Sequence, residues 1–358
     1  MSNTQKQSQQ LIIDFDKPID SSNTKLEISS LIPNAKSTIV FDSYWHFAVE
    51  RQNIFFKRFE DAPLPWTTDP ILEKYKFTNA YRASDRTSLY LIRNVIYRED
   101  LPSTINEVFF RILLFKLFNK IETWQLLEKE IGHITFADYT FERYNEILTK
   151  AMDNNQSIYS AAYIMPSGGK TFGYQVKHRN HLKLIERMMA DELPKKLQDT
   201  PKMEQGFKML REYPTIGNFL AYQFITDINY SEITDWDEMD FVVPGPGALD
   251  GISKCFTDIG ERNESDIIKD VTEIQEEAFK HLGLDFRSLW GRKLQPIDCQ
   301  NLFCEVDKYA RVKHQDILGR SGRSRIKQKY IRTQKSIDYW YPPKWQINSA
   351  IQKEKGKK

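Results

Sequence analysis

Asn79, Arg82 and Asp85 lie close together in the run Phe-Thr-Asn-Ala-Tyr-Arg-Ala-Ser-Asp-Arg at positions 77–86. Arg82 and Asp85 are three residues apart, so on a helix their side chains share a face and can form an ion pair. An amide, a guanidinium and a carboxylate grouped in this way can bind the edge of a heterocyclic base or a phosphate. The same spacing is also typical of a structural Arg–Asp pair at a helix end, and both interpretations stay open.

Asp227 ends the apolar run 219–228. A carboxylate at the C-terminal end of a buried helix faces the negative end of the helix dipole. Such a group has either a raised pKa, which suits a catalytic acid or base, or a cationic partner. An ordinary polar helix end is the alternative. Further along the chain, Glu305 and Lys308 are also three residues apart and can pair.

The stretch 241–252 contains Gly245, Pro246 and Gly247 after an apolar run. This pattern predicts a tight turn whose backbone N–H groups point outward at the start of a helix, which is an anion site. It resembles the hairpin of helix-hairpin-helix DNA-repair proteins, which grip the DNA backbone without reading its sequence. A plain loop is the alternative. Asp250 follows and can either face the same groove or act as a first-turn acid, and Lys254 is a candidate phosphate contact.

The essential aspartate of helix-hairpin-helix glycosylases lies a few helical turns beyond the hairpin glycines. In this chain that window holds Asp266 and Asp270. Both lie in a charged run that is typical of a capped, solvated helix start. The acids at 235–240 precede the hairpin, and there a solvated loop is favoured over a metal site.

The C-terminal end is strongly basic. Residues 311–358 carry fourteen Lys and Arg against three Asp and Glu, whereas the rest of the chain has a net charge of −9. Arg320, Arg323 and Arg325 stand in this segment, and five aromatic residues follow them. Basic and aromatic side chains in alternation favour contact with a phosphate backbone and exposed bases over a merely solvated tail.

Several site classes are disfavoured. The Gly-Gly-Lys-Thr run at 168–171 lacks the first glycine of a phosphate-binding loop. The six histidines show no metal-ligand spacing, and three cysteines are one short of an iron–sulfur ligand set. The N-terminus lacks the apolar core of a secretion signal, and no apolar run is long enough to span a membrane. We therefore expect no metal and no cofactor in a cytoplasmic, reduced protein.

Apolar residues at helical spacing predict a mainly α protein. Two segments depart from that pattern: 159–174 is expected to hold a small β hairpin, and 1–30 to be flexible. The body is expected at 31–312 and a basic aromatic extension at 313–358. The predicted helices lie at 37–60, 84–98, 103–119, 140–153, 177–193, 203–213, 216–228, 248–256, 265–282 and 298–312.

Four segments in this order carry a resemblance to a known family: 77–86, Gly-Asn-Phe-Leu-Ala-Tyr-Gln at 217–223 with Asp227, 245–248, and Phe-Cys-Glu-Val-Asp-Lys-Tyr at 303–309. The chain resembles the α-glutamyl/putrescinyl thymine pyrophosphorylases and the helical domain of 5-hydroxymethyluracil DNA kinases. The resemblance implies a helical DNA-glycosylase-like (helix-hairpin-helix) fold and action on modified bases in double-stranded DNA. The kinase members carry a further nucleotide-kinase domain that is not recognised in this sequence, so kinase activity is not expected.

Three functions follow from this resemblance and from the residues. The leading expectation is a DNA glycosylase that flips and excises a hypermodified pyrimidine, as antiviral defence against phage DNA. The first alternative is a transferase that joins an amine or amino acid to a pyrophosphorylated 5-hydroxymethylpyrimidine, and the second is a non-catalytic binder of modified DNA. The candidate residues are Asp85, Asp227 and Asp250 for catalysis, Asn79, Arg82, Tyr81, Tyr222, Glu305 and Lys308 for the base pocket, and Gly245, Pro246, Gly247, Lys254, Arg320, Arg323 and Arg325 for DNA binding.

Overall fold

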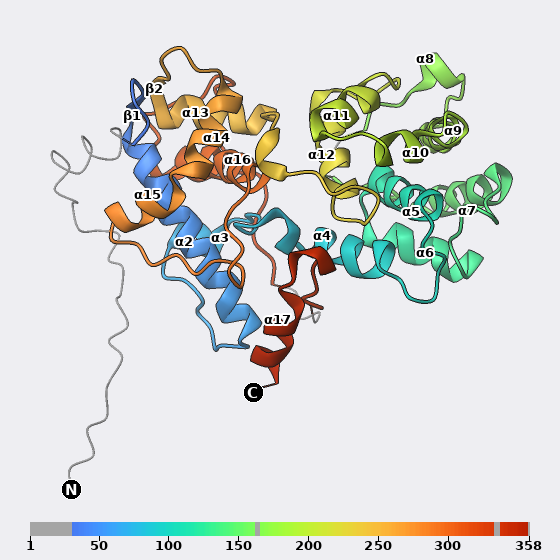
Figure 1. Ribbon diagram of the computed structural model, residues 1–358, viewed down its shortest axis with the longest axis horizontal. Coiled ribbons are helices and arrows are strands. Elements are labelled where there is room, and N and C mark those ends of the chain that lie inside the picture. The colour runs from blue at the N-terminus through green and yellow to red at the C-terminus, as the bar shows by residue number, and fades with distance from the viewer. Residues whose placement is uncertain (1–30, 162–164, 333–336, 357–358) are drawn as a thin grey trace, which may run out of the picture.

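The computed structural model describes residues 31–161, 165–332 and 337–356. In these residues the chain is mainly α-helical with one two-stranded antiparallel sheet, which confirms the predicted class. The helices form two groups, one with α2 and α13–α16 and the other with α5–α12, and α4 lies between them (Figure 1). The elements are β1 (Lys36–Ser37), α2 (Ile39–Phe59), α3 (Pro70–Lys74), η1 (Arg82–Ser84), α4 (Arg86–Leu91), η2 (Ile92–Ile96), α5 (Ile105–Phe118), α6 (Ile121–Ile131), α7 (Phe141–Asp153), α8 (Gly169–Phe172), α9 (Lys177–Ala190), α10 (Leu193–Gln198), α11 (Met203–Arg211), α12 (Asn218–Ile228), η3 (Glu238–Asp240), α13 (Pro246–Cys255), β2 (Phe256–Asp258), α14 (Glu264–Glu273), α15 (Gln275–His281), α16 (Pro296–Lys313), η4 (Pro343–Trp345) and α17 (Asn348–Lys355).

Helix α2 forms the core of the first group. It begins at Thr38, whose hydroxyl accepts a hydrogen bond from the backbone N–H of Val40 and so caps the helix. Phe41, Tyr44 and Trp45 are fully buried and pack against aromatic rings from β2, α16 and α15. The aromatic periodicity seen in the sequence is therefore the core face of this helix.

Glycines let α13 pack very closely on α16. A Cβ at Gly251 would lie 2.0 Å from the carbonyl oxygen of Phe303, and one at Gly247 would lie 2.3 Å from Sγ of Cys304. These two glycines are one helical turn apart, so both face α16. Gly245 precedes the helix with a φ of −78°, and its Cβ position is only 2.9 Å from the ring of Phe219. Dense packing accounts for these glycines, and the expected tight glycine turn is not formed.

Helix α5 is central in the second group, as its uniformly apolar sequence predicts. It contacts α6, α9, α10 and α12, and its residues from 107 to 118 are all buried. Asn119 ends it in the left-handed conformation, with a φ of 47°. Helix α6 begins after the two connecting residues Asn119 and Lys120, and it was not among the helices predicted from the sequence.

The predicted β hairpin at 159–174 is wrong for the residues described there. The glycines at 168 and 173 take positive φ angles and flank the one-turn helix α8. The Asn180 amide bonds the Ser167 and Tyr174 carbonyls and accepts a hydrogen bond from the Tyr174 N–H, which holds this loop on α9. The two-stranded sheet instead joins β1 to β2, which are far apart in the sequence.

The C-terminal extension packs on both helix groups. Residues 328–330 run beside the end of α3 through backbone hydrogen bonds from Lys76 to Gln328 and from Tyr330 to Lys74. Tyr341 is fully buried and shares a hydrogen bond with Ser84. Tyr341 was expected to meet exposed bases, but it belongs to the core. In the described part of the chain no helix has the length and apolar character needed to span a bilayer.

Candidate functional site

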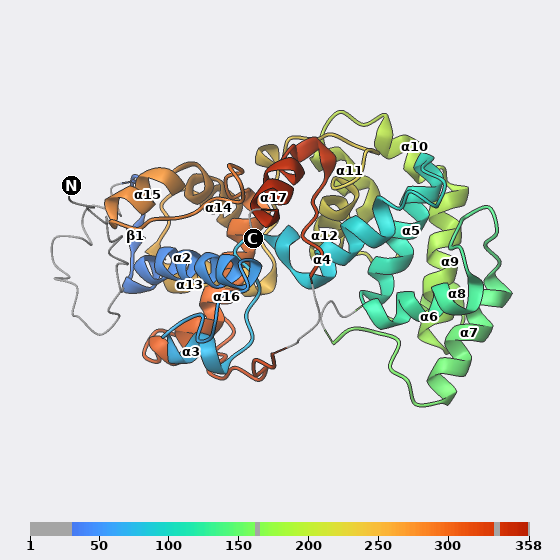
Figure 2. The ribbon, with the colours of Figure 1, turned by 90° about the horizontal axis from the view of Figure 1, so that it is seen from below.

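A cavity of about 460 Å³ lies between α2, α3 and the C-terminal extension, and we call it the aromatic pocket. Figure 2 shows the segment after α16 passing α3 on its way to this region. The pocket combines apolar and aromatic walls with a few polar groups, as ligand sites usually do. Its lining consists of Arg51, Ile54, Phe55, Arg58, Leu64, Pro65, Trp66, Thr67, Leu72, Glu73, Tyr75, Phe77, Asn79, Ser84, Tyr330, Ile337 and Tyr339.

The polar side of the pocket is built on the segment 77–85. Arg51 of α2 donates to the Thr78 carbonyl at 2.9 Å and to Oδ1 of Asn79 at 3.1 Å. Asn79 in turn donates its backbone N–H to Asp85 at 2.9 Å and its side-chain amide to the Ser84 carbonyl at 2.8 Å. The Asn79 amide is therefore held in a fixed orientation at the pocket wall.

Glu305 and Lys308 of α16 reach the same segment. Glu305 accepts a hydrogen bond from the Thr78 backbone N–H at 3.0 Å and pairs with Lys308 at 2.6 Å. The Lys308 ammonium also lies 5.3 Å from the centre of the Phe77 ring. The predicted Glu305–Lys308 pair is confirmed, and it is mostly buried.

Asp85 is the carboxylate with the most unusual electrostatics near the pocket. Burial raises its pKa to about 7, and the charge of Glu305 adds to that rise. The backbone N–H of Asn79 and the guanidinium of Arg51 oppose it. A carboxylic acid with a pKa near neutrality can both take up and release a proton under physiological conditions.

A second hollow shares one lining residue with the aromatic pocket. This polar groove has a volume of about 440 Å³ and includes Arg86, Tyr90 and Asn94 in its lining. Ile337 lines both hollows. Ser84 lines the first hollow and Arg86 the second, so the residues on either side of Asp85 in the sequence contribute to both.

The expected ion pair between Arg82 and Asp85 is wrong. Arg82 turns the other way and forms two hydrogen bonds with the Asp227 carboxylate, at 2.8 and 3.0 Å. It also donates to Gln223 and Tyr230. At 2 % exposure, Arg82 ties η1 to α12 inside the protein.

Asp227 has the cationic partners that its position demands. Besides Arg82, the ammonium of Lys116 lies 3.1 Å from its Oδ2. Burial raises the pKa of Asp227, but the two cations outweigh burial and leave the pKa below its ordinary value. The sequence left open either a raised pKa or a cationic partner for Asp227, and the structure shows cationic partners.

The two tyrosines expected to stack on a base are core residues. The Tyr81 hydroxyl donates to the Arg292 carbonyl and accepts from the Leu289 N–H. Tyr222 is 2 % exposed and packs edge-on against Phe241. Neither tyrosine lines the aromatic pocket.

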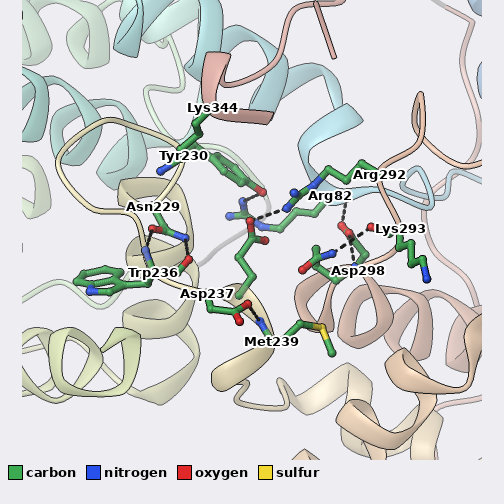
Figure 3. Close-up of polar contacts among 12 residues, drawn as sticks. Arg82, Asn229, Tyr230, Trp236, Asp237, Met239, Arg292, Lys293, Asp298 and Lys344 are labelled. Atoms are coloured by element: carbon green, nitrogen blue, oxygen red, sulfur yellow. Dashed lines mark hydrogen bonds and ion pairs between the residues drawn. The ribbon is translucent and has the colours of Figure 1, made fainter. Parts of the chain in front are cut away.

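A smaller polar cavity of about 210 Å³ includes Asp235, Asp237 and Glu238 in its lining. Figure 3 shows Asp237, Arg292 and Lys344 of this lining. Two of its acids have cationic partners, because Glu238 pairs with Arg292 at 2.6 Å and the Lys344 ammonium lies 3.7 Å from Asp235. Asp298 accepts backbone N–H groups of Arg82 and Gln295, and burial raises its pKa to about 7. No three His, Cys, Asp or Glu side chains form a metal-binding group within the described ranges.

The predicted DNA-binding residues have different surroundings. Gly245, Pro246 and Gly247 stand at the start of α13, and Pro246 is exposed. Lys254 does not fit the expected phosphate contact, because it is 1 % exposed and pairs with Asp307 at 3.0 Å. Arg325 is exposed in the basic segment.

Side-chain contacts of Asp250, Arg320 and Arg323 link the basic C-terminal segment to helices α13 and α14. Asp250 accepts hydrogen bonds from the Ser321 backbone and hydroxyl and from Arg323. These partners hold its pKa below the ordinary value despite its burial. Arg320 pairs with Glu264 of α14 at 2.5 Å. These contacts fasten the basic segment to the helical body.

Arg51 and Trp66 are site residues that the sequence analysis missed. The signal for Arg51 was a charged Glu50–Arg51 pair inside an otherwise aromatic helix. Glu50 is also occupied, since it accepts the Thr67 hydroxyl at 2.5 Å. Trp66 gave no such signal, because it lies in a loop between two prolines and a threonine pair, where helical spacing says nothing about direction.

Comparison with models of protein families matches residues 38–319 to the 5-hmdU DNA kinase helical domain. Among curated proteins, a 5-hmdU DNA kinase of Bacillus phage SP10 is 28% identical over 290 residues. The aligned region covers 75% of this chain and 45% of the phage protein, so this chain spans less than half of that relative's length. No solved structure gives a significant match.

Proposed function

We propose, since this chain belongs to the family of 5-hmdU DNA kinase helical domains, that it binds DNA carrying 5-hydroxymethyluracil and receives that base in the aromatic pocket. A base inside a duplex must leave the stack before a protein can hold it or act on it. The observation that carries this proposal is a pocket with aromatic walls whose lining includes Arg51 and Asn79, while Asp85 and Glu305 accept hydrogen bonds from the backbone of residues 78–79.

The walls and the polar side have separate tasks in this proposal. Trp66, Tyr75 and Phe77 offer ring surfaces on which a base can stack. The Asn79 amide has both donors and an acceptor, which suits the edge of a pyrimidine. Because Arg51 and the Ser84 carbonyl already orient that amide, little conformational entropy is lost on binding.

Asp85 would be the proton acceptor for chemistry at the 5-hydroxymethyl group. If the hydroxyl oxygen attacks the terminal phosphorus of a nucleoside triphosphate, its proton passes to Asp85 as the new P–O bond forms, the old P–O bond breaks and the nucleoside diphosphate leaves. If an amine instead displaces an activated hydroxymethyl oxygen, the proton of the amine passes to Asp85. The pKa of about 7 suits a general base in either reaction.

Base excision is the second candidate, and one observation favours it. Asp85 and Glu305 are close enough for their charges to interact, and carboxylate pairs serve hydrolysis at a sugar carbon. Excision would need one carboxylate to position water or stabilise the developing positive charge on the sugar. The description of the family and the name of the phage relative speak for base modification and give excision no support.

The test uses duplexes that carry one thymine, one 5-hydroxymethyluracil or one 5-hydroxymethylcytosine at the same position. Binding is measured by fluorescence anisotropy with the full chain, its Asn79→Ala variant and, as a distant carboxylate control, Asp153→Asn. We expect tighter binding of 5-hydroxymethyluracil that Asn79→Ala weakens about tenfold and Asp153→Asn leaves unchanged. Equal affinity for all three duplexes contradicts the proposal.

Mass spectrometry of the same DNA then separates the chemistries. Incubation with a nucleoside triphosphate and Mg²⁺ should add a group to the hydroxymethyl oxygen if the chain transfers phosphoryl groups. Release of free base with an alkali-labile site indicates excision. Selective binding without either product identifies a recognition module.

A further inference from the structure

Exposed apolar side chains gather at the rim of the aromatic pocket. Five large apolar residues are strongly exposed in the described part of the chain. Leu64 and Tyr330 line the pocket, and Ile331 directly follows Tyr330. Leu64 is 53% exposed and Ile331 is 80% exposed. Keeping apolar groups of this size in water is unfavourable, so their clustering at one opening indicates a contact surface.

These side chains stand on anchored backbone. Leu64 lies in the connection between α2 and α3, where the Trp66 indole donates to the Ala62 carbonyl and Lys57 donates to the Trp66 carbonyl. The segment before Ile331 is held by the backbone bonds of residues 328–330 beside α3. Leu64 therefore stands in the pocket lining on supported backbone, and the exposed Ile331 follows the supported lining residue Tyr330.

Positive charge surrounds this rim. Arg58 lines the pocket, and the Arg332 guanidinium lies 5.6 Å from the centre of the Trp66 ring. Lys327 and Lys329 are exposed on the approach, and Glu73 is the acidic residue of the pocket lining. Apolar groups flanked by cations fit nucleic acid, because phosphates meet the cations while bases meet the apolar groups.

We infer that Leu64 and Ile331 form a wedge that enters the DNA base stack and occupies the space left by the base held in the aromatic pocket. This inference rests on the proposed function of that pocket. Unstacking one base step is unfavourable, and inserted aliphatic side chains recover part of that cost. The wedge favours binding only when the DNA starts as a stacked duplex, since a single strand has no paired stack to keep open.

The test compares Leu64→Ala, Ile331→Ala and the double variant with the unchanged chain. Met152→Ala is the matched control, because Met152 is an exposed apolar residue on α7 in the other helix group. The probes are a duplex and a single strand, each with one 5-hydroxymethyluracil beside 2-aminopurine. Affinity is measured by anisotropy, and unstacking by the rise in 2-aminopurine fluorescence.

We expect the double variant to bind the duplex at least tenfold more weakly and to lose most of the fluorescence rise. Its affinity for the single strand should stay within about twofold, which shows that the pocket is intact. Unchanged duplex binding and fluorescence, or an equal loss on both probes, overturns the wedge. If the unchanged chain binds neither probe in preference to its thymine counterpart, the proposed function fails first.

Discussion

At the residue scale, Arg82 and Asp85 show how neighbours in sequence take different roles. Arg82 is buried with two hydrogen bonds to Asp227, while Asp85 accepts the backbone N–H of Asn79, a residue that lines the aromatic pocket. Desolvation lowers the pKa of buried cations and raises that of buried acids unless a partner compensates. Asp227 has two cationic partners, whereas Asp85 has Glu305 nearby, so their pKa values shift in opposite directions.

Asp85→Asn should abolish chemistry while preserving binding. The asparagine oxygen can still accept the Asn79 N–H, so the pocket keeps its shape. Loss of a general base lowers turnover by about 10²–10⁴. In the unchanged chain the rate should rise with pH and level off above about pH 7, where Asp85 is ionised. A pH–rate profile on 5-hydroxymethyluracil DNA measures both, and a variant with full turnover contradicts the assignment.

Asp85→Asn should also change how stability depends on pH. The pKa of Asp85 is about 7 in the folded chain and about 3.9 in an unfolded one. Between these pH values the folded state binds more protons, so the contribution of Asp85 destabilises the fold increasingly as pH rises from 4 to 7. The variant should therefore gain stability relative to the unchanged chain between pH 5 and pH 8. Urea unfolding at both pH values measures the difference, and a constant difference contradicts the shift.

Asp227→Ala should destabilise the fold by about 3–5 kcal/mol, because it leaves Arg82 and Lys116 as uncompensated buried charges. Equilibrium denaturation measures this change. Asp237→Ala is a suitable control, since that carboxylate caps only the short η3 turn. A loss of turnover without a loss of stability would instead favour a catalytic role for Asp227.

At the element scale, the contact of α13 with α16 depends on residues without side chains. The backbones approach so closely that Gly251 faces the carbonyl of Phe303 directly. The apposition also places Glu305 and Lys308 of α16 where they meet segment 77–79. Packing of these two helices therefore helps to build the candidate site.

Gly251→Ala should destabilise the chain by about 3 kcal/mol or more. A Cβ 2.0 Å from a backbone oxygen forces α13 away from α16. Gly217→Ala, at a negative φ with no atom within 4 Å, should lose at most about 1 kcal/mol. Urea unfolding of both variants measures the contrast, and equal effects would show that the helices can separate at little cost.

At the scale of the whole molecule, the basic segment after α16 connects the helical body to the aromatic pocket. It is fastened at one end through Asp250 and Ser321 and at the other beside α3. Its exposed cations therefore lie along a fixed path toward the pocket. Such a path can hold DNA phosphates without reading sequence.

Replacing Arg325, Lys327 and Lys329 by alanine should weaken DNA binding equally for all sequences. Each lost phosphate contact lowers the slope of log K against log salt by about 0.9. Arg320→Ala should have a smaller effect, because Glu264 already neutralises that guanidinium. Anisotropy titrations between 50 and 200 mM salt measure the slopes, and an unchanged slope for the triple variant contradicts a phosphate role.

The sequence by itself determined the helical class, most helix positions and the segments that identify the family. Apolar periodicity reports which face of a helix is buried, so α2, α5 and α12 follow from it directly. The run 77–86 was also recognised as a place where chemistry-bearing residues gather. Local spacing suffices for these conclusions because they concern residues within a few turns of one another.

Only the tertiary structure determined which side chains interact with one another. Arg82 reaches Asp227 rather than Asp85, and Arg51, Asn79 and Tyr330 meet at one pocket, because long-range packing brings together segments that are distant in sequence. The structure also determined the role of Gly247. A glycine suits a tight turn or a close helix contact, and here it allows the close contact with Cys304. A residue type limits which contacts are possible, but which of them forms depends on the neighbours that the folded chain places around the residue.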